Sequence, residues 1–160
     1  MALRVGDAAP DFKLPCTTGE KSGEFQLSTH RGKVVVLVFY PLDFTPVCST
    51  EMPTFESDLA KFAGYNAQVV GVSTDSVACH VAWQRSLGGL SYPLASDKWP
   101  YGEVAKAYGI FPATKAAHLG INERAVFVID KDGKIAWVKI YDLGQQPDIA
   151  EVLDAVRKLT

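Results

Sequence analysis

A run of six apolar residues, 34–39, is the feature that most limits how this chain can fold. Valine, leucine and phenylalanine without polar alternation are typical of a strand covered on both faces, so we expect it at the centre of a sheet. The run ends near Pro41, and a polar loop then leads to Cys48, where a helical pattern begins. Unpaired N–H groups and a partial positive charge at a helix N-terminus favour thiolate over thiol. The pattern therefore predicts an exposed, activated cysteine.

The segments after Cys48 alternate between helix and strand patterns. Pro53 cannot donate an N–H, so we expect the turn that carries Cys48 to be weakly joined to the helix behind it. This order predicts an α/β fold with a central mixed β-sheet flanked by helices on both faces. We expect strands over residues 68–73, 124–129 and 134–140, and helices up to Gly64 and over residues 77–87, 103–108 and 147–159.

The length of 160 residues, 48% of them apolar, suits a single domain over residues 1–160. Residues 1–33 are rich in glycine, proline and charged side chains, and we expect them to form an N-terminal hairpin extension that caps the core. The turn Asp132-Gly133 predicts a hairpin between the strands on either side of it.

Charge and cysteine content exclude several classes of function. Sixteen Lys and Arg against eighteen Asp and Glu leave no basic surface for nucleic acid or membrane lipid, so a small or protein partner is expected. No apolar run approaches the ~18 residues of a spanning helix, and the N-terminus lacks a secretory h-region. Three cysteines suit free thiols in a reducing compartment, which indicates a cytoplasmic location.

Neither a metal nor an organic cofactor is indicated by the motifs. His30, His80 and His118 show no ligand spacing, and no Cys-x-x-Cys or His-Glu-x-x-His occurs. Nor is there a glycine-rich loop for a nucleotide or flavin. We therefore expect chemistry that depends on side chains alone.

The pattern Pro41-x-x-x-Thr45-x-x-Cys48, with Arg124 opening a later strand, resembles the active-site signature of the peroxiredoxins. Residues 6–12, 73–76 and 92–97 agree with the same family. The resemblance implies a thioredoxin-like fold, a thiol-dependent peroxidase of the AhpC/TSA superfamily, and a homodimer or larger homo-oligomer. Residues 100–110 followed by 124–130 look most similar to the one-cysteine alkyl hydroperoxide reductase E type.

The resemblance also gives these residues roles. It implies that Cys48 is the nucleophile, and that Arg124 lies next to it because its strand runs antiparallel beside residues 34–39. Attack on a hydroperoxide breaks the O–O bond, so donors from Arg124, from the Thr45 hydroxyl and from the backbone would stabilise the departing oxygen. Pro41 is expected to shield the sulfur from water and overoxidation, and Glu51 to accept from Arg124 and orient it.

Attack would leave a sulfenic acid on Cys48, which a second thiol must reduce. No cysteine follows Cys79, so the C-terminal resolving cysteine of the typical two-cysteine members is expected to be missing. Cys79 is then the internal candidate for a disulfide, although it could also simply be buried under its helix. Otherwise thioredoxin, a glutaredoxin-like protein or a low-molecular-weight thiol would act directly. Cys16 is either a spare thiol or an intermolecular partner.

The leading hypothesis is a peroxidase for hydrogen peroxide, organic hydroperoxides and peroxynitrite. A thiol–disulfide oxidoreductase on the same fold is an alternative, disfavoured because Cys48 has no partner at Cys-x-x-Cys spacing. A redox sensor or holdase, whose oxidised form exposes apolar surface, is a further alternative.

Overall fold

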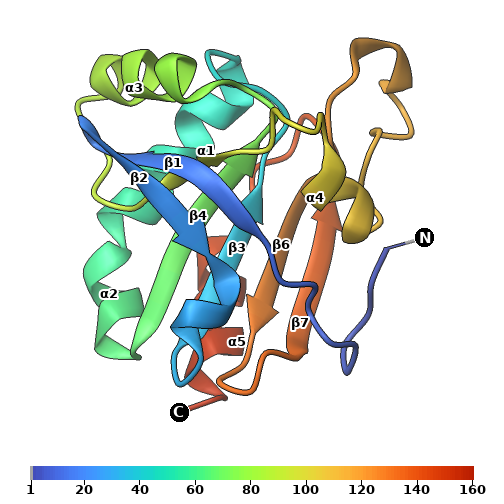
Figure 1. Ribbon diagram of the computed structural model, residues 1–160. Helices are drawn as coiled ribbons and strands as arrows, with labels where there is room; N and C mark the ends of the chain where they lie inside the picture. Colours follow the sequence, from blue (N-terminus) through green and yellow to red (C-terminus); the bar gives the residue numbers. More distant parts are fainter. Residues whose placement is uncertain (1) are drawn as a thin grey trace.

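A computed structural model describes residues 2–160, whose strands form one seven-stranded sheet (Figure 1). The strands are β1 (Lys13–Thr18), β2 (Lys21–Gln26), β3 (Val34–Phe39), β4 (Ala67–Ser73), β5 (Leu94–Ser96), β6 (Arg124–Ile129) and β7 (Ile135–Tyr141). The helices are α1 (Pro46–Ser57), α2 (Leu59–Gly64), α3 (Val77–Ser86), α4 (Glu103–Ala107) and α5 (Ile149–Arg157), with the 3₁₀ helices η1 (Leu27–His30) and η2 (Ala117–Leu119).

The sheet has the order β2-β1-β5-β4-β3-β6-β7 and is mixed. Strands β3, β4 and β5 run parallel, while β6 and β7 continue the sheet antiparallel on one side and β1 and β2 on the other. All six residues of β3 are buried, which confirms the prediction of a central strand. Its last residue, Phe39, pairs with Ala125, so Arg124 lies beside the end of β3 as expected.

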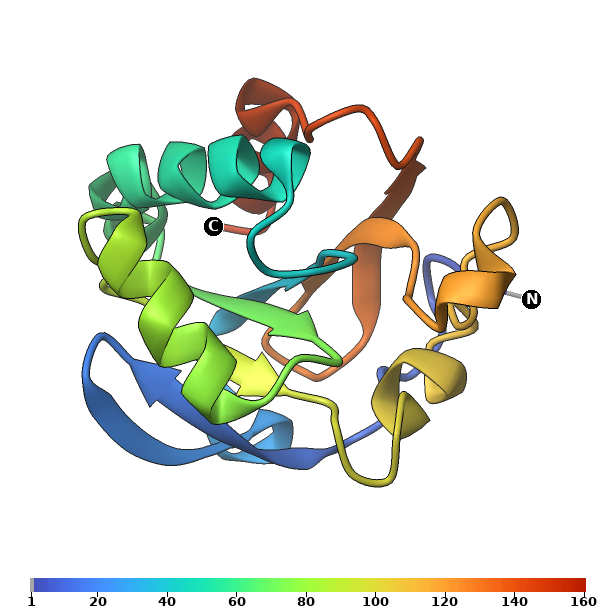
Figure 2. The same cartoon turned by 90° about the horizontal axis from the view of Figure 1, so that it is seen from above.

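Side chains from β3 alternate between two buried clusters, one on each face of the sheet. Val34, Val36 and Val38 join a cluster that includes side chains of α1, α2, α3 and α5. Val35, Leu37 and Phe39 face the other cluster, with α4 and the N-terminal strands. Helices therefore cover both faces, which confirms the predicted α/β class, and α1 and α3 lie side by side on the same face (Figure 2).

Two expectations from the sequence need correction. Residues 13–26 do form a hairpin, but β1 also pairs with the short strand β5, so the hairpin extends the sheet instead of only capping the core. Strand β5 was not predicted. Helix α1 runs continuously through Pro53 and ends at Ser57, so proline does not separate the turn of Cys48 from the helix behind it. The break comes later, at Asp58, between α1 and α2.

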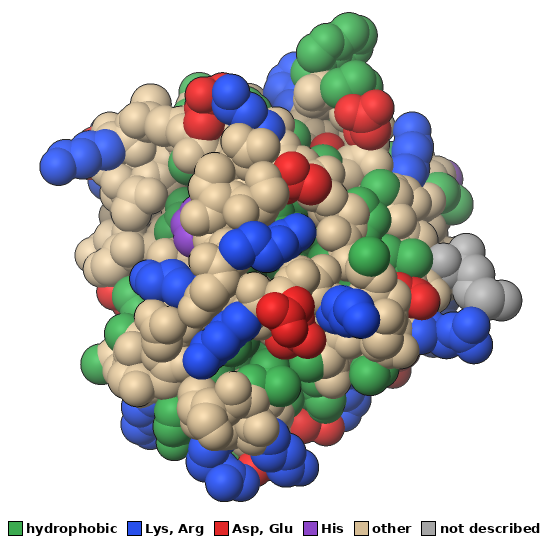
Figure 3. Space-filling view, turned by 60° about the horizontal axis from the view of Figure 1, so that its bottom comes forward, with side chains coloured by type: hydrophobic (Ala, Val, Ile, Leu, Met, Phe, Trp, Pro, Cys, Tyr) green, Lys and Arg blue, Asp and Glu red, His purple; other side chains and the backbone are tan. Residues whose placement is uncertain are grey.

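The turn between β6 and β7 is held by Asp130, as its sequence predicted. The carboxylate accepts from the N–H groups of Asp132 and Lys134 at 2.9 and 3.0 Å, and Gly133 has a φ of 87°, a conformation in which a side chain is strained. Among residues 2–160, none of the helices has the length and apolar character that crossing a membrane requires. Basic and acidic side chains are interspersed on the face drawn in Figure 3.

Candidate active site

Cys48 is the third residue of α1, directly beyond the end of the central strand. The helix starts at Pro46, whose fixed φ and missing N–H suit a first helical position. The N–H groups of Val47 and Cys48 have no acceptor within the helix, and the side chain of the N-cap residue Thr45 does not cap them. Two backbone donors and the positive end of the helix therefore lie in the turn that carries Cys48.

The thiol of Cys48 is buried, not exposed as the sequence suggested. Its exposed fraction is 0% because α1 packs on the sheet and the sulfur joins the cluster that contains Val38, Met52 and Val126. Arg124 Nη1 lies 3.3 Å from the sulfur, and the arginine is itself only 2% exposed. The structure thus brings together the two residues that the sequence placed together, in a site closed to bulk water.

Arg124 is held on both sides of its guanidinium. Nη1 donates to a carboxylate oxygen of Glu51 as well as to the sulfur, while Nε and Nη2 donate to the carbonyl of Leu143 at 3.2 and 2.8 Å. The rigid fork of the guanidinium matches this arrangement, which an ammonium group could not reproduce. The plane of Arg124 is therefore fixed relative to Cys48, as the prediction for Glu51 required.

Glu51 lies one turn after Cys48 in α1 and has an exposed fraction of 0%. Burial raises the pKa of its carboxyl from the ordinary value of 4.5 to about 7, against the opposing effect of Arg124. The second oxygen, Oε2, has no hydrogen-bond partner among residues 2–160. The ion pair with Arg124 is the one interaction that compensates this buried charge, so the two residues depend on each other.

The Thr45 hydroxyl donates to the carbonyl of Leu42 at 2.7 Å. With its proton engaged in this way, the oxygen offers lone pairs, so it suits accepting an O–H from a hydroperoxide better than the donor role that the sequence suggested. Pro41 is buried at the start of the same loop and follows Tyr40, whose N–H donates to the carbonyl of Val72 at 3.1 Å. The loop is thus anchored at the end of β3.

Residues 5–138 match the model of the AhpC/TSA family. The chain belongs to the AhpC/TSA family of peroxiredoxins. It is 38% identical to Peroxiredoxin-1 of Gekko japonicus over 160 residues, which cover 96% of this chain and 77% of that protein. It is 37% identical to the chloroplastic 2-Cys peroxiredoxin BAS1 of Arabidopsis thaliana over 162 residues, 97% of this chain and 59% of the relative.

Among solved structures, AhpC of Mycobacterium tuberculosis matches with a TM-score of 0.88 and 28% identity, covering 99% of this chain and 94% of that chain. The comparison confirms the predicted thioredoxin-like fold and shows that this peroxiredoxin is a thiol-dependent peroxidase. Relatives that bear the name 2-Cys peroxiredoxin give no support to the predicted one-cysteine E type.

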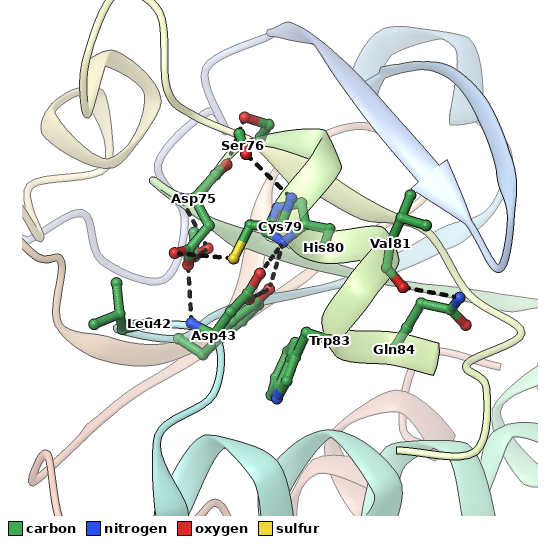
Figure 4. A network of polar contacts seen from close by, with 12 residues as sticks. Leu42, Asp43, Asp75, Ser76, Cys79, His80, Val81, Trp83 and Gln84 are labelled. Atoms are coloured by element: carbon green, nitrogen blue, oxygen red, sulfur yellow. Dashed lines mark hydrogen bonds and ion pairs between the residues drawn. The ribbon is translucent and has the colours of Figure 1, made fainter. Parts of the chain in front are cut away.

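Cys79 in this peroxiredoxin lies in the first turn of α3, next to two carboxylates. Its thiol donates weakly to Asp75 Oδ1 at 3.9 Å, and Asp43 lies on its other side (Figure 4). Burial and the charges of Asp43 and Asp75 raise the pKa of the thiol to about 12. All three cysteines are free, with Cys16 buried in β1.

Ligand atoms of Asp43, Asp75 and Cys79 lie within 4.8 Å of one another, the kind of grouping that can hold a metal ion. The carboxylate oxygens already accept hydrogen bonds from Tyr40, Ser73 and the backbone of Asp43. We therefore describe this group as a polar network and assign no metal to it.

The contacts of several buried residues around the peroxiredoxin site were not predicted from the sequence. His80 pairs with Asp43, and the indole N–H of Trp83 donates to Ser49 Oγ at 3.1 Å, which joins α3 to the first turn of α1. The positions of His80, Trp83 and Gln84 follow the i, i+3, i+4 spacing of one helix face, and all three are buried. This spacing was the signal that could have identified His80 as an inward-facing residue.

A hollow of about 280 Å³ lies beside the first turn of α1, lined by Pro46, Val47, Thr50, Gly144 and Gln146. A larger hollow, of about 400 Å³, lies between residues 10–14 and α4 and contains no thiol. Since the chemistry of a peroxiredoxin requires a thiol, we place the candidate site at Cys48 and not at the larger hollow.

Proposed function

We propose that this peroxiredoxin reduces hydrogen peroxide, organic hydroperoxides and peroxynitrite through a sulfenic acid on Cys48. The observation that carries the proposal is the buried contact of 3.3 Å between the Cys48 sulfur and Arg124, with Glu51 bound to the same guanidinium nitrogen. The thiolate is the nucleophile in this chemistry, and reactive cysteines typically lie beside a cation such as this one.

In the proposed reaction, the thiolate of Cys48 attacks the nearer oxygen of the hydroperoxide. The S–O bond forms as the O–O bond breaks, and the sulfur is oxidised to a sulfenic acid. The departing oxygen takes a proton to leave as water or an alcohol, and with peroxynitrite the leaving group is nitrite. Donors directed at the departing oxygen stabilise charge that develops only in the transition state. Arg124 and the N–H groups of Val47 and Cys48 are these donors, and the Thr45 oxygen accepts the O–H of the bound hydroperoxide.

For the second half of the cycle we propose an external thiol, which attacks the sulfenic acid, forms a mixed disulfide with Cys48 and releases water. The thiol belongs to thioredoxin, a glutaredoxin-like protein or a small molecule. Support comes from Cys79, since burial and two neighbouring carboxylates raise its pKa to about 12 and so make it a poor resolving nucleophile.

The decisive experiment treats the reduced protein with one equivalent of hydrogen peroxide and weighs the intact chain under non-reducing conditions. Cys48→Ser and Cys79→Ser are the two matched variants, each of which lacks one of the two thiols. We expect one added oxygen on Cys48 in wild type and in Cys79→Ser. Loss of two hydrogens that Cys79→Ser abolishes would replace the external thiol by an internal disulfide.

Turnover with added thiol tests the nucleophile itself. Cys48→Ser should lower the peroxidase rate at least about a thousandfold, while Cys79→Ser keeps the wild-type rate. Full turnover by Cys48→Ser would overturn the proposal. Stoichiometric oxidation without turnover under any reductant, with suppression of client aggregation, would favour a redox sensor or holdase instead.

We further propose that the chain works as a homodimer or larger homo-oligomer in the cytoplasm. Large apolar side chains are exposed at Phe44, Trp99 and Leu119, which suits association. The three free cysteines suit a reducing compartment. Analytical ultracentrifugation of the reduced protein tests the oligomer, and a protein that sediments as a monomer at every concentration would exclude it.

A further inference from the structure

His80 is a buried ionisable residue that the proposed reaction does not use. It has an exposed fraction of 0%, and both of its ring nitrogens face acceptors (Figure 4). Nδ1 lies 2.7 Å from Asp43 Oδ2, and Nε2 lies 3.1 Å from the carbonyl of Ala95. A carbonyl can only accept, so Nε2 donates to it, and Nδ1 shares a proton with the Asp43 carboxyl group. The Tyr40 hydroxyl donates to the other oxygen, Asp43 Oδ1, at 2.6 Å and lies 3.3 Å from Nδ1.

A second carboxylate lies close to the contact between His80 and Asp43. Asp75 Oδ2 accepts the backbone N–H of Asp43 at 2.9 Å and the hydroxyl of Ser73 at 2.6 Å. The Cys79 thiol, 3.9 Å from Asp75 Oδ1, is the other neighbour in this network. Asp43 is therefore held through its side chain by His80 and through its backbone by Asp75.

Asp43 lies in the loop that connects β3 to the helix of Cys48. The residue before it, Leu42, supplies the carbonyl that holds the Thr45 hydroxyl at 2.7 Å. The residue after it, Phe44, has a φ of 66°, which is uncommon for a bulky side chain and persists only where the surroundings impose it. A displacement of Asp43 would therefore shift Thr45 and the start of α1.

We propose that His80 is a positioning residue of the peroxidase reaction. Its ring holds Asp43, and through Asp43 the loop of residues 40–45, in the conformation that presents Thr45 and the N-terminus of α1 to a hydroperoxide at Cys48. This inference rests on the proposed function at Cys48 and assigns His80 to the oxidation step, not to the reduction by thiol.

Two amide variants separate the contacts of the ring. In His80→Asn the amide nitrogen takes the place of Nδ1 and can still donate to Asp43, whereas in His80→Gln it takes the place of Nε2 and can donate only to Ala95. We expect His80→Gln to lower the second-order rate of Cys48 oxidation about tenfold or more, and His80→Asn to retain most of the rate. His30→Gln, on η1 away from the loop, is the control and should keep the wild-type rate.

Rates are measured by single-turnover fluorescence and compared with the unfolding free energy of each variant in urea. A purely structural role would lower the stability of both His80 variants and leave equal oxidation rates in the folded protein. Equal rates in His80→Asn, His80→Gln and wild type would overturn the proposal.

Nitrogen NMR of the wild-type protein gives a second test that needs neither a variant nor activity. We expect the His80 signals of a ring that is hydrogen-bonded through both nitrogens, and an Nδ1 without a hydrogen bond would overturn the inference. Failure of the proposed function has a different signature, since Cys48 of the wild type would then not react with peroxide although both His80 nitrogens are hydrogen-bonded.

Discussion

Cys48 and Cys79 occupy equivalent places in the fold but have opposite surroundings. Each is the third residue of a helix that follows one of two adjacent parallel strands, α1 after β3 and α3 after β4. The sulfur of Cys48 faces the guanidinium of Arg124, while that of Cys79 faces Asp75 and Asp43. Position at a helix N-terminus therefore does not distinguish the two thiols, whereas the charge of the side chains across from each thiol does.

Capping adds to this difference. The hydroxyl of Ser76 accepts the N–H of Cys79 at 3.1 Å, so the first turn of α3 satisfies its own donor. The N-cap residue of α1, Thr45, directs its hydroxyl to Leu42 instead and leaves the N–H groups of Val47 and Cys48 for another partner. The N-terminus of α3 is thus capped by a side chain of its own, whereas the N–H groups at the N-terminus of α1 are left available for a substrate oxygen.

Removing the cation beside Cys48 should have the largest effect on the difference between the two thiols. Arg124→Gln should lower the second-order rate of Cys48 oxidation by about a hundredfold to a thousandfold, because a donor to the departing oxygen is lost. Arg124→Lys should recover little, since an ammonium cannot contact the sulfur, Glu51 and Leu143 together. Stopped-flow measurement with hydrogen peroxide gives these rates. Arg85→Gln, which changes an exposed arginine of α3, is the control. Equal decreases in the oxidation rate of Arg85→Gln and Arg124→Gln would rule out a specific role for Arg124.

The buried carboxyl group of Glu51 allows the charges around Cys48 to be tested through the pH dependence of stability. Because its pKa is raised from 4.5 to about 7, its contribution to stability is fully present below pH 4.5 and is lost as the pH rises through 7. Wild type should therefore lose up to about 3 kcal/mol more unfolding free energy than Glu51→Gln between pH 4.5 and 8. Urea unfolding at both pH values measures the difference. Glu24→Gln, an exposed acid, should follow the wild type, and parallel curves for Glu51→Gln would contradict the raised pKa.

Removing a carboxylate should make Cys79 more similar to an ordinary thiol. Asp75→Asn, made in a Cys48→Ser background, should lower the pKa of Cys79 from about 12. At mildly alkaline pH, a decrease of one in this pKa raises the thiolate fraction of Cys79 about tenfold. Alkylation by iodoacetamide should accelerate by about that factor. Asp132→Asn, in the exposed turn after β6, should leave the rate unchanged. If Asp75→Asn is no faster than this control, the carboxylates do not suppress the thiol.

The smallest expected effect concerns the contact that joins the two regions. Ser49→Ala leaves the buried indole N–H of Trp83 without its acceptor and should cost about 1 kcal/mol of unfolding free energy. Ser57→Ala, an exposed serine at the end of the same helix, should change stability by less, because its partner carbonyl remains close to water. Urea unfolding of the two variants compares them, and equal losses would show that the link to α3 adds nothing.

The central strand and the C-terminal hairpin could be predicted from the sequence because their signals are local or continuous, whereas the Cys48–Arg124 contact was predicted from the family resemblance. Residues 34–39 are apolar without interruption, which fixes a covered strand, and Asp132-Gly133 fixes the hairpin that starts at Arg124. The register of β3 with β6 then follows from the fold that the family resemblance implies. These features needed no knowledge of long-range polar contacts.

The place of the N-terminal hairpin in the sheet and the His80 network could not be predicted in the same way. Four of the six residues of β2 are exposed, so the strand has little hydrophobic pattern, and its place is decided by pairing with β1. The continuity of α1 through Pro53 depends on packing of Met52 and Phe55 in the core, which outweighs the missing N–H. The pairing of His80 with Asp43 joins residues 37 positions apart, and no spacing within either segment encodes it.

The burial of Cys48 limits how fast the thiol can be regenerated. A site with an exposed fraction of 0% must open before any second molecule reaches the sulfur, and a protein thiol needs a far wider opening than a peroxide. At low concentration the reductant acts only on the open fraction, and its apparent affinity is reduced by that fraction. At high reductant concentration, the rate at which the site opens sets the maximum rate at which the thiol is regenerated. Reductants that differ greatly in intrinsic reactivity would then regenerate this thiol at the same limiting speed.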